Sequence, residues 1–365
     1  MTAKANQLDE KWMRLALHHA RRGIGRTAPN PPVGCVIIKD NEIVGHAHTA
    51  DQGRPHAEAI ALEMAGQNAR GASAYVTLEP CSHHGQTAPC ARALVEAGIQ
   101  KVFIGTKDQA PHVNGAGISY LQNHGLDVYT GLCESQCIDL AQGFFLSQLE
   151  NRPLVTLKMA STLDGKIATK SGESQWITSS HARRRSHLER SMHDAIMVGI
   201  QTVLDDDPDL TSRITGYSHK IIRCVMDSTL RISPDSKLVQ SAKDKPLWVF
   251  HQSGEESRQQ RLTQLGVRVI KVKDTRNLKI VMAELAQQDI TRLLVEGGAR
   301  LTASFIQQNL VDRLLWFRAP LIIGHEGRQS VQGEVLDKLS NALRFKKQES
   351  QSLGQDMLEI YQKAE

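Results

Sequence analysis

The sequence predicts an α/β fold built as two consecutive units. Short apolar stretches with the length of buried strands alternate with helical patterns, first over residues 8–147 and again beyond residue 153. The chain has 365 residues, which is more than one hydrophobic core usually organises. Between the two series the polar segment QLENRP ends at Pro153, a residue that cannot continue a helix. We therefore expect domains at residues 1–147 and 154–365.

The first unit opens with an amphipathic helix in LDEKWMRLALHHARRG, and VGCVIIK, DN and EIVGH then predict a strand, a turn and a second strand. A helix in HAEAIALEMAGQNA follows. The strand SAYVTLE, helix CARALVEAG, strand KVFIG, helix ISYLQNHG and strand LDVYT continue the alternation, and a last helix ends near Ser147. Such alternation predicts a largely parallel sheet that is covered by helices.

The second unit repeats the alternation without being a sequence repeat of the first. Helical and turn segments separate seven apolar stretches that predict strands: LVTLKMA, AIMVG, IIRCVMD, PLWVF, VRVIKV, RLLVEGG and RLLWFRAP. We expect a second sheet with helices on its faces.

Charge and composition exclude several classes of protein. The net charge of +5 comes from 44 basic and 39 acidic residues, an imbalance too small to indicate a nucleic-acid surface by itself, although it suits a basic pocket for phosphate. The N-terminal MTAKANQLDEKWM lacks the apolar core of a signal peptide, and no apolar run is long enough to cross a bilayer. We expect a cytoplasmic protein without a membrane partner.

The six cysteines indicate metal binding rather than disulfides, because a chain of this length needs no covalent staples and a reducing cytoplasm would not keep them. Four of the cysteines lie in apolar or helical surroundings and are expected to be packing residues: Cys35, Cys133, Cys137 and Cys224.

A catalytic zinc site is predicted by HAE and by PCSHHGQTAPC. His56, Cys81 and Cys90 supply one imidazole and two thiolates, the set of three protein ligands that leaves a fourth place for water. Glu58 lies two residues beyond His56 and can face that water without binding the metal, as a proton shuttle. Prolines before His56 and Cys90 predict that both ligands lie at helix starts, where the helix dipole favours anionic ligands. The alternative is a structural zinc whose fourth ligand is His83 or His84.

Zinc deaminases share an H-x-E element and a later proline-cysteine pair. Here eight residues separate Cys81 from Cys90, and this spacing, with PNPPVG, HAE and PCSHHGQTAPC, resembles the deaminase half of the bifunctional riboflavin-biosynthesis deaminase/reductase family. STLDGKIAT, ESQWITS, TVLDDDPDLTSR and VEGG follow in the family's order, so the resemblance covers nearly the whole chain. It implies a cytidine-deaminase-like zinc domain followed by a dihydrofolate-reductase-like domain.

The resemblance implies two enzymatic activities. The first is zinc-dependent hydrolytic deamination of 2,5-diamino-6-ribosylamino-4(3H)-pyrimidinone 5′-phosphate, and the second is NADPH-dependent reduction of the ribosyl chain to ribityl. The implied cofactors are Zn²⁺ and NADPH, and the implied partner is a small phosphorylated pyrimidine rather than a nucleic acid. We expect a homo-oligomer.

The same resemblance implies substrate contacts in the first unit by Asn30, His48 and Asp108. From the residues alone, Asn30 between two prolines could be a turn former, and Asp108 could be an exposed loop acid. Many relatives carry a lysine or arginine where this chain has Gln86, which can offer the substrate phosphate only an uncharged hydrogen bond.

In the second unit the resemblance implies two further sets of contacts. The positions for NADPH are Ala160, Trp176, Thr202, Asp206, Ser228, Gly298, Ala299, Arg300, Leu301, Thr302, Ala303 and Ser304. The positions for substrate are Lys158, Ser174, Arg190, Leu210, Arg213 and Glu296.

Residue chemistry supports parts of both sets. VEGGA lies between a predicted strand and a predicted helix, so its N–H groups suit a phosphate, although G-x-G-x-x-G is missing and Gly297 and Gly298 could form a tight turn. Arg190 and Arg213 suit a ribose phosphate because a guanidinium can hold two oxygens at once, although Arg190 could be a solvated helix residue. Lys158 could contact substrate or pair with an acid.

Two other functions use part of the same pattern. HAE and PC also occur in deaminases that edit nucleic acids, but these need a basic groove with aromatic side chains, and aromatic residues make up only 4% of this chain. A catalytically silent zinc-stabilised binding module would need Glu58 to be dispensable.

Overall fold

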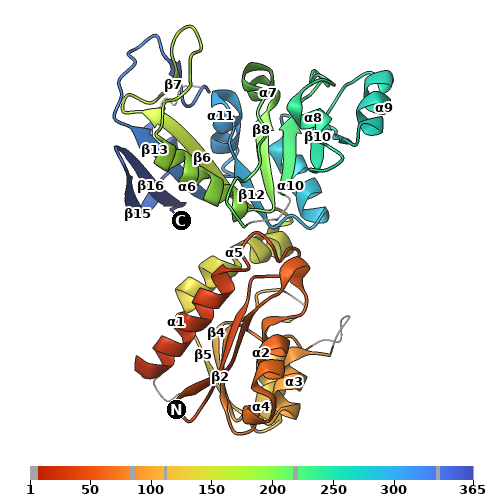
Figure 1. Ribbon diagram of the computed structural model, residues 1–365, viewed down its shortest axis with the longest axis vertical. Coiled ribbons are helices and arrows are strands. Elements are labelled where there is room, and N and C mark those ends of the chain that lie inside the picture. Colours follow the sequence, from red (N-terminus) through yellow and green to blue (C-terminus); the bar gives the residue numbers. More distant parts are fainter. Residues whose placement is uncertain (1–6, 83–87, 111–112, 217–220, 334–337, 365) are drawn as a thin grey trace. The chain divides into compact units, whose positions relative to one another are not determined.

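The computed structural model describes residues 7–82, 88–110, 113–216, 221–333 and 338–364. The chain divides into two compact units, Met1–Asn151 and Arg152–Glu365, and both have the mixed α/β architecture that the sequence predicts (Figure 1). Gln86, His83 and His84 lie outside the described residues. In the described ranges, no helix combines the length and the apolar character needed to cross a membrane.

The first unit contains a five-stranded sheet in the order β2-β1-β3-β4-β5. Its strands confirm the five predicted ones: β1 (Gly34–Lys39), β2 (Glu42–His48), β3 (Ser73–Leu78), β4 (Lys101–Thr106) and β5 (Asp127–Thr130). The expectation of a largely parallel sheet is wrong, because β1 pairs antiparallel with both β2 and β3, and only β3, β4 and β5 are parallel. A two-residue turn joins β1 to β2, with Asp40 and Asn41 at φ of 49° and 66°, and so short a turn can only reverse the chain.

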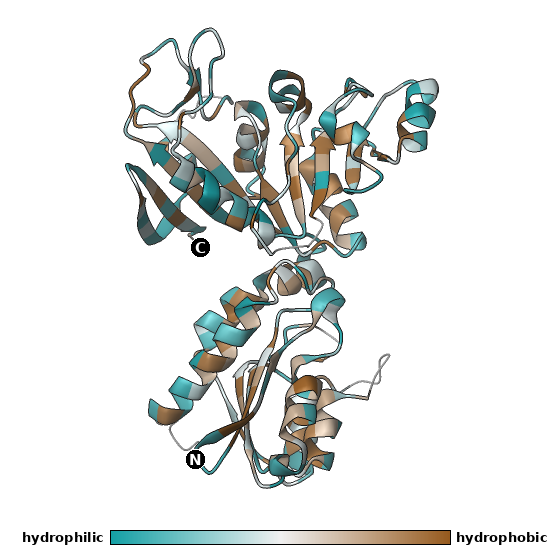
Figure 2. Cartoon of the chain, in the orientation of Figure 1, coloured by the Kyte–Doolittle hydropathy of each residue, from teal (hydrophilic) through white to brown (hydrophobic). Residues whose placement is uncertain are grey.

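Helices cover both faces of this sheet: α1 (Gln7–Arg21), α2 (Ala57–Ala65), α3 (Cys90–Glu96), α4 (Ala116–Asn123) and α5 (Glu134–Glu150). Trp12 and Met13 of α1 pack with Val36 and Phe103 on one face, whereas α2, α3 and α4 contribute to a second apolar cluster. Figure 2 shows the apolar strands between these helices. The second helix is shorter than predicted, because Gly66 takes a positive φ and η2 (Gly66–Ala69) follows.

The second unit contains a nine-stranded sheet in the order β11-β10-β9-β8-β12-β6-β13-β16-β15. Seven parallel strands confirm the prediction: β6 (Leu154–Thr162), β8 (Ala195–Gly199), β9 (Ile222–Met226), β10 (Leu247–His251), β11 (Arg268–Lys271), β12 (Arg292–Val295) and β13 (Arg313–Ala319). An antiparallel hairpin of β15 (Phe345–Leu353) and β16 (Asp356–Lys363) extends the sheet beyond β13 and was not predicted. The short strands β7 (Lys166–Ala168) and β14 (Arg328–Gln329) pair separately.

Two apolar clusters lie on the two faces of the large sheet. One cluster includes α10 (Leu278–Gln287) and α11 (Ala299–Gln307), and the other includes α6 (Ser180–Ser191), α7 (Ile200–Asp206), α8 (Lys237–Gln240) and α9 (Glu256–Gln264). Because seven neighbouring strands run parallel, their carboxyl ends lie along one edge of the sheet. Open α/β proteins bind their ligands at this edge.

Candidate functional sites

Three metal-ligating side chains converge in the first unit. His56 Nδ1 lies 3.8 Å from Cys81 Sγ and 3.3 Å from Cys90 Sγ, and all three ligand atoms lie within 4.8 Å of one another. Bonds of roughly 2.0 to 2.3 Å in a tetrahedral arrangement bring neighbouring ligands of one zinc ion to about 3.5 Å from each other. The three donors therefore fit a single zinc ion.

The local fold explains why these ligands meet. His56 is the N-cap of α2, Cys90 is the first residue of α3, and Cys81 follows the end of β3. The backbone N–H of Cys90 donates to Cys81 Sγ at 3.3 Å, so an otherwise unpaired group of a helix start stabilises a thiolate. Both helix starts lie where the prolines in the sequence predict them.

The two thiols act as a pair. The Cys90 thiol donates to Cys81, and this hydrogen bond lowers the pKa of Cys81 to about 4. The same bond, together with burial, raises the pKa of Cys90. The hydrogen bond between Cys81 and His56 raises the pKa of the imidazole. Two sulfurs that share one proton beside an imidazole form a donor set suited to a divalent cation.

Glu58 lies beside this donor set without belonging to it. It is the second residue of α2 and is 4% exposed, and its side chain contacts Cys90. Burial raises the pKa of the Glu58 carboxyl to about 7. A buried carboxyl next to a zinc site, but outside its ligands, matches the position of the proton shuttle of zinc deaminases.

Glu79 is a buried acid that the sequence analysis missed. It lies just after β3 and two residues before Cys81, and its carboxylate accepts four backbone hydrogen bonds of 2.9 to 3.3 Å, from Asp108, Gly115, Gly117 and Ile118. The start of α4 also lies against Pro80, because a Cβ on Gly117 would come within 2.0 Å of the Pro80 carbonyl oxygen. The available signal was an acidic residue at the end of an apolar strand, where a buried charge needs several partners.

The three expected substrate residues of this unit make local contacts. Asn30 donates from Nδ2 to the Gly53 carbonyl at 2.8 Å, and His48 Nδ1 lies 2.8 Å from the Thr49 carbonyl. Asp108 is buried and accepts from the Ala110 N–H at 2.8 Å, so the alternative of an exposed loop acid is wrong.

The second unit has a cleft of about 1780 Å³. A pocket for one small molecule measures about 300 to 1,000 Å³, so this cleft has room for a dinucleotide and a substrate together. Most of the expected contact residues line it: Lys158, Ala160, Ser174, Trp176, Arg190, Thr202, Asp206, Leu210, Arg213, Glu296, Gly298, Ala299, Arg300, Leu301 and Thr302.

Three expected cofactor residues lie elsewhere. Ser228 lines a smaller cavity and bonds with Thr275, their hydroxyls 2.7 Å apart. Ala303 is buried within α11, and the Ser304 hydroxyl donates to the Arg300 carbonyl of the same helix.

The turn after β12 suits a cofactor phosphate. Gly298 is the N-cap of α11, and since it has no side chain to cap the helix, the first N–H groups of α11 remain available to an anion. A Cβ on Gly297 would come within 2.9 Å of Leu301, whereas one on Gly298 would first meet Thr202 Oγ1 at 3.5 Å and would occupy space in the cleft. Neither glycine takes a positive φ, so a turn that needs one does not explain them.

An ion-pair cluster occupies the other side of this turn. Arg190 donates from Nε and Nη2 to both carboxylate oxygens of Glu296, at 2.8 and 2.9 Å, and Lys158 Nζ lies 3.6 Å from the same carboxylate. Burial alone would raise the pKa of Glu296, but the charges of Arg190 and Lys158 lower it to about 2. Arg190 Nη1 also donates to the Thr211 carbonyl, so three of the five N–H groups of its guanidinium are already used within the protein. Arg213, by contrast, is exposed in the cleft.

Each of the two units matches a known protein family. Residues 6–106 match the cytidine and deoxycytidylate deaminase zinc-binding region, and residues 153–358 match the RibD C-terminal domain. The chain is 38% identical over 357 residues to the riboflavin biosynthesis protein RibD of Aquifex aeolicus, covering 98% of this chain and 99% of the relative. It is 41% identical over 361 residues to RibD of Escherichia coli, covering 96% and 98%.

Two solved structures of similar proteins superpose on nearly the whole chain. Acinetobacter baumannii RibD, form 1, superposes with a TM-score of 0.89 at 36% identity, covering 98% of this chain and 99% of that one. A Thermotoga maritima protein described as a diaminohydroxyphosphoribosylaminopyrimidine deaminase and 5-amino-6-(5-phosphoribosylamino)uracil reductase superposes with a TM-score of 0.87 at 33% identity, with the same coverage. With a zinc-deaminase site in one unit and a reductase cleft for NADPH in the other, the chain belongs to the RibD family of bifunctional deaminase/reductases of riboflavin biosynthesis.

Proposed function

We propose that residues 1–147 deaminate 2,5-diamino-6-ribosylamino-4(3H)-pyrimidinone 5′-phosphate, and that residues 154–365 then reduce the ribosyl chain to ribityl. The observation that carries the proposal is the convergence of His56, Cys81 and Cys90 beside the buried carboxyl of Glu58. The description of the Thermotoga maritima relative supports the choice of substrate.

In the deaminase, His56, Cys81 and Cys90 would hold a zinc ion, which would supply a water molecule activated as a nucleophile at neutral pH. Glu58 takes a proton from that water and delivers protons to the ring nitrogen and to the departing ammonia. The net change replaces the exocyclic amine at C2 of the pyrimidinone by a carbonyl oxygen. In this proposal Asn30 holds the pyrimidine, and His48 and Asp108 make further contacts with the substrate.

In the reductase, NADPH supplies the hydride. The N–H groups from Gly298 to Thr302 bind the cofactor pyrophosphate, and other lining residues complete its site: Ala160, Trp176, Thr202 and Asp206. Arg213 is the main cation for the substrate phosphate, because its guanidinium is exposed in the cleft. Arg190 keeps Glu296 ionised and oriented, and it has two N–H groups left for the substrate.

Two assays on the purified enzyme test both activities. With the diaminopyrimidinone phosphate alone, we expect ammonia release without a reduced product. With NADPH added, we expect ammonia release followed by loss of nicotinamide absorbance, with one NADPH consumed per ammonia. Absorbance loss that precedes any ammonia release would contradict the proposed order, and absence of ammonia release would contradict the deaminase assignment.

We also propose that the protein forms a homo-oligomer, and that it lies in the cytoplasm, since a phosphorylated substrate and NADPH do not cross membranes unaided. Light scattering during size-exclusion chromatography tests the assembly, with a mass of 40.4 kDa expected for a monomer. Fractionation of cells tests the location.

A further inference from the structure

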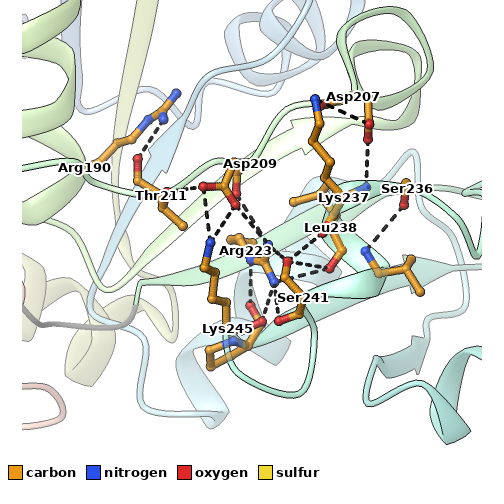
Figure 3. Close-up of polar contacts among 12 residues, drawn as sticks. Arg190, Asp207, Asp209, Thr211, Arg223, Ser236, Lys237, Leu238, Ser241 and Lys245 are labelled. Carbon is orange, nitrogen blue, oxygen red and sulfur yellow. Dashed lines mark hydrogen bonds and ion pairs between the residues drawn. The ribbon is translucent and has the colours of Figure 1, made fainter.

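Arg223 is a cation placed inside the second unit. It belongs to β9, its side chain is 0% exposed, and burial lowers the pKa of its guanidinium to about 10. A buried charge is retained only where hydrogen bonds replace water. Figure 3 shows that the guanidinium donates to the Asp209 carbonyl, the Ser241 hydroxyl, and the carbonyls of Leu238, Ser241 and Lys245. It also donates to the Pro246 carbonyl.

Asp209 is the acid that faces this cation. Arg223 Nη1 lies 4.0 Å from its carboxylate, and Lys245 Nζ donates to both carboxylate oxygens, at 3.0 and 3.3 Å. The hydroxyl of Thr211 donates to Asp209 Oδ2 at 2.6 Å. Asp209 lies in the connection between α7 and β9, so these contacts fasten that connection to the body of the sheet.

The contacts continue to the cleft. The Thr211 carbonyl accepts from Arg190 Nη1 at 3.0 Å and lies 3.2 Å from His187 Nδ1. Arg190 in turn holds Glu296 through two hydrogen bonds. A continuous series of polar contacts, here called the Asp209 network, therefore links Arg223, Lys245, Asp209, Thr211, Arg190 and Glu296.

Leu210 lies between Asp209 and Thr211, which are both held by the Asp209 network. Its φ is +56°, a conformation that residues other than glycine adopt at a cost, and its side chain is buried. Such a conformation persists when neighbouring contacts over-determine it, and here Asp209 and Thr211 are fixed on either side. The direction in which the chain leaves Leu210 decides where Arg213 lies.

We propose that Asp209 is a positioning residue of the reductase, which sets the Leu210–Arg213 segment so that Arg213 meets the substrate phosphate. The inference rests on the proposed function, in which Arg213 binds that phosphate. Asp209 also lines the cleft, but an anionic carboxylate repels a phosphate, and this one is already shared by Lys245 and Thr211. Its effect on the substrate is therefore exerted through the segment that follows it.

The test compares Asp209→Asn and Thr211→Val in the full-length enzyme. Thr211→Val removes the hydrogen bond from the Thr211 hydroxyl to Asp209, and Asp209→Asn disrupts that bond and the ion pair with Lys245. Each variant should therefore raise the KM for the deaminated substrate about fivefold, while kcat and the KM for NADPH stay within about twofold. The double variant should be non-additive, because the second change removes a contact that the first has already lost. Ammonia release by the first unit should be unchanged.

Asp312→Asn is the matched control. Asp312 also pairs with an arginine in this unit, Arg152, at 2.7 and 3.0 Å, but it immediately precedes β13, at the opposite end of the strands from the cleft. This variant should lower thermal stability and leave the KM for substrate unchanged. A rise in that KM in Asp312→Asn would mean that general destabilisation explains the effect, and it would overturn the inference.

Arg213→Ala separates the inference from the function on which it rests. If Arg213→Ala raises the KM for substrate and Asp209→Asn does not, the positioning role is wrong and the phosphate site stands. If Arg213→Ala leaves the KM unchanged, the phosphate site is wrong and the inference fails with it. Equal rises in the KM for substrate and for NADPH in Asp209→Asn would also overturn it.

Discussion

In the proposed deaminase, Glu58 carries the proton transfers without holding the metal. Its carboxyl is buried beside Cys90, and the group of metal-ligating atoms in the described residues does not include it. We expect Glu58→Gln to lower ammonia release by a factor of about 10² to 10⁴, because glutamine has nearly the same shape but cannot carry a proton. Zinc content and reduction of supplied deaminated substrate should stay at the wild-type level.

Zinc analysis and the two activity assays check this expectation. Loss of zinc would make Glu58 a ligand or a structural residue, and ammonia release within about tenfold of wild type would assign the shuttle to another group. Glu63→Gln, an exposed carboxyl on the same helix, is the matched control and should change neither activity.

How well the sequence predicts a residue depends on whether its partners are nearby in the chain. The HAE element places His56 and Glu58 at one helix start, so spacing alone predicts their relation. Glu79 contacts residues about 30 to 40 positions away, and Arg223 of β9 contacts Asp209, in the connection before that strand, and Ser241, which follows α8. No local pattern encodes such contacts, so the candidate ligands could be predicted from the sequence but the residues that support them could not.

At the scale of elements, apolar patterning predicted the five strands of the first sheet and the seven parallel strands of the second, but not the partly buried β7 and β16. It missed β15, whose sequence FKKQESQSL is polar because the strand lies at the edge of the sheet and is largely exposed. It also gave the first sheet the wrong strand directions, since alternation with helices predicts parallel pairs and the hairpin of β1 and β2 begins with no intervening helix.

The start of α4 depends on the carboxylate of Glu79. We expect Glu79→Gln to destabilise the first unit by about 1.5 to 3 kcal/mol, because the amide replaces one acceptor oxygen by a donor that faces backbone N–H groups. Deamination should weaken through the KM for substrate, since Asp108 is held by the same carboxylate. Thermal unfolding and deaminase kinetics check this, with reduction of supplied intermediate as the internal control; unaltered unfolding would contradict the role.

His193, which follows α6, gives the second unit a dependence on pH. Its Nδ1 lies 2.7 Å from the Glu189 carbonyl, Nε2 has no partner in the part of the chain that the structure describes, and burial lowers the pKa of the ring to about 3. The unfolded chain binds a proton below about pH 6.5, whereas the folded protein resists protonation until about pH 3, so stability is lost as pH falls through this interval.

We therefore expect His193→Asn to lose less stability than wild type between pH 7 and pH 4.5, by about 2 kcal/mol. Urea unfolding of both proteins at the two pH values measures the difference. Parallel losses in the two proteins would show that His193 is protonated as easily in the folded state as in the unfolded one.

At the scale of the whole molecule, the two chemistries use separate parts of the chain. The zinc ligands lie between residues 56 and 90, and the residues lining the reductase cleft lie between 158 and 332. We expect a chelator to remove zinc and abolish ammonia release while reduction of supplied intermediate continues, and added zinc to restore deamination. Loss of both activities on chelation, with both restored by zinc, would show that the reductase also needs the metal.

The turn that follows β12 has a consequence for ligand binding. Glu296, which is held by Arg190, is only two residues from Gly298, the N-cap residue of α11, so in the proposed function the substrate side and the cofactor side of the cleft share one short piece of backbone. We expect a displacement of this backbone by one ligand to change the affinity for the other, so that the two binding equilibria are thermodynamically linked. Linkage is reciprocal, so the factor by which substrate changes the affinity for NADPH must equal the factor by which NADPH changes the affinity for substrate.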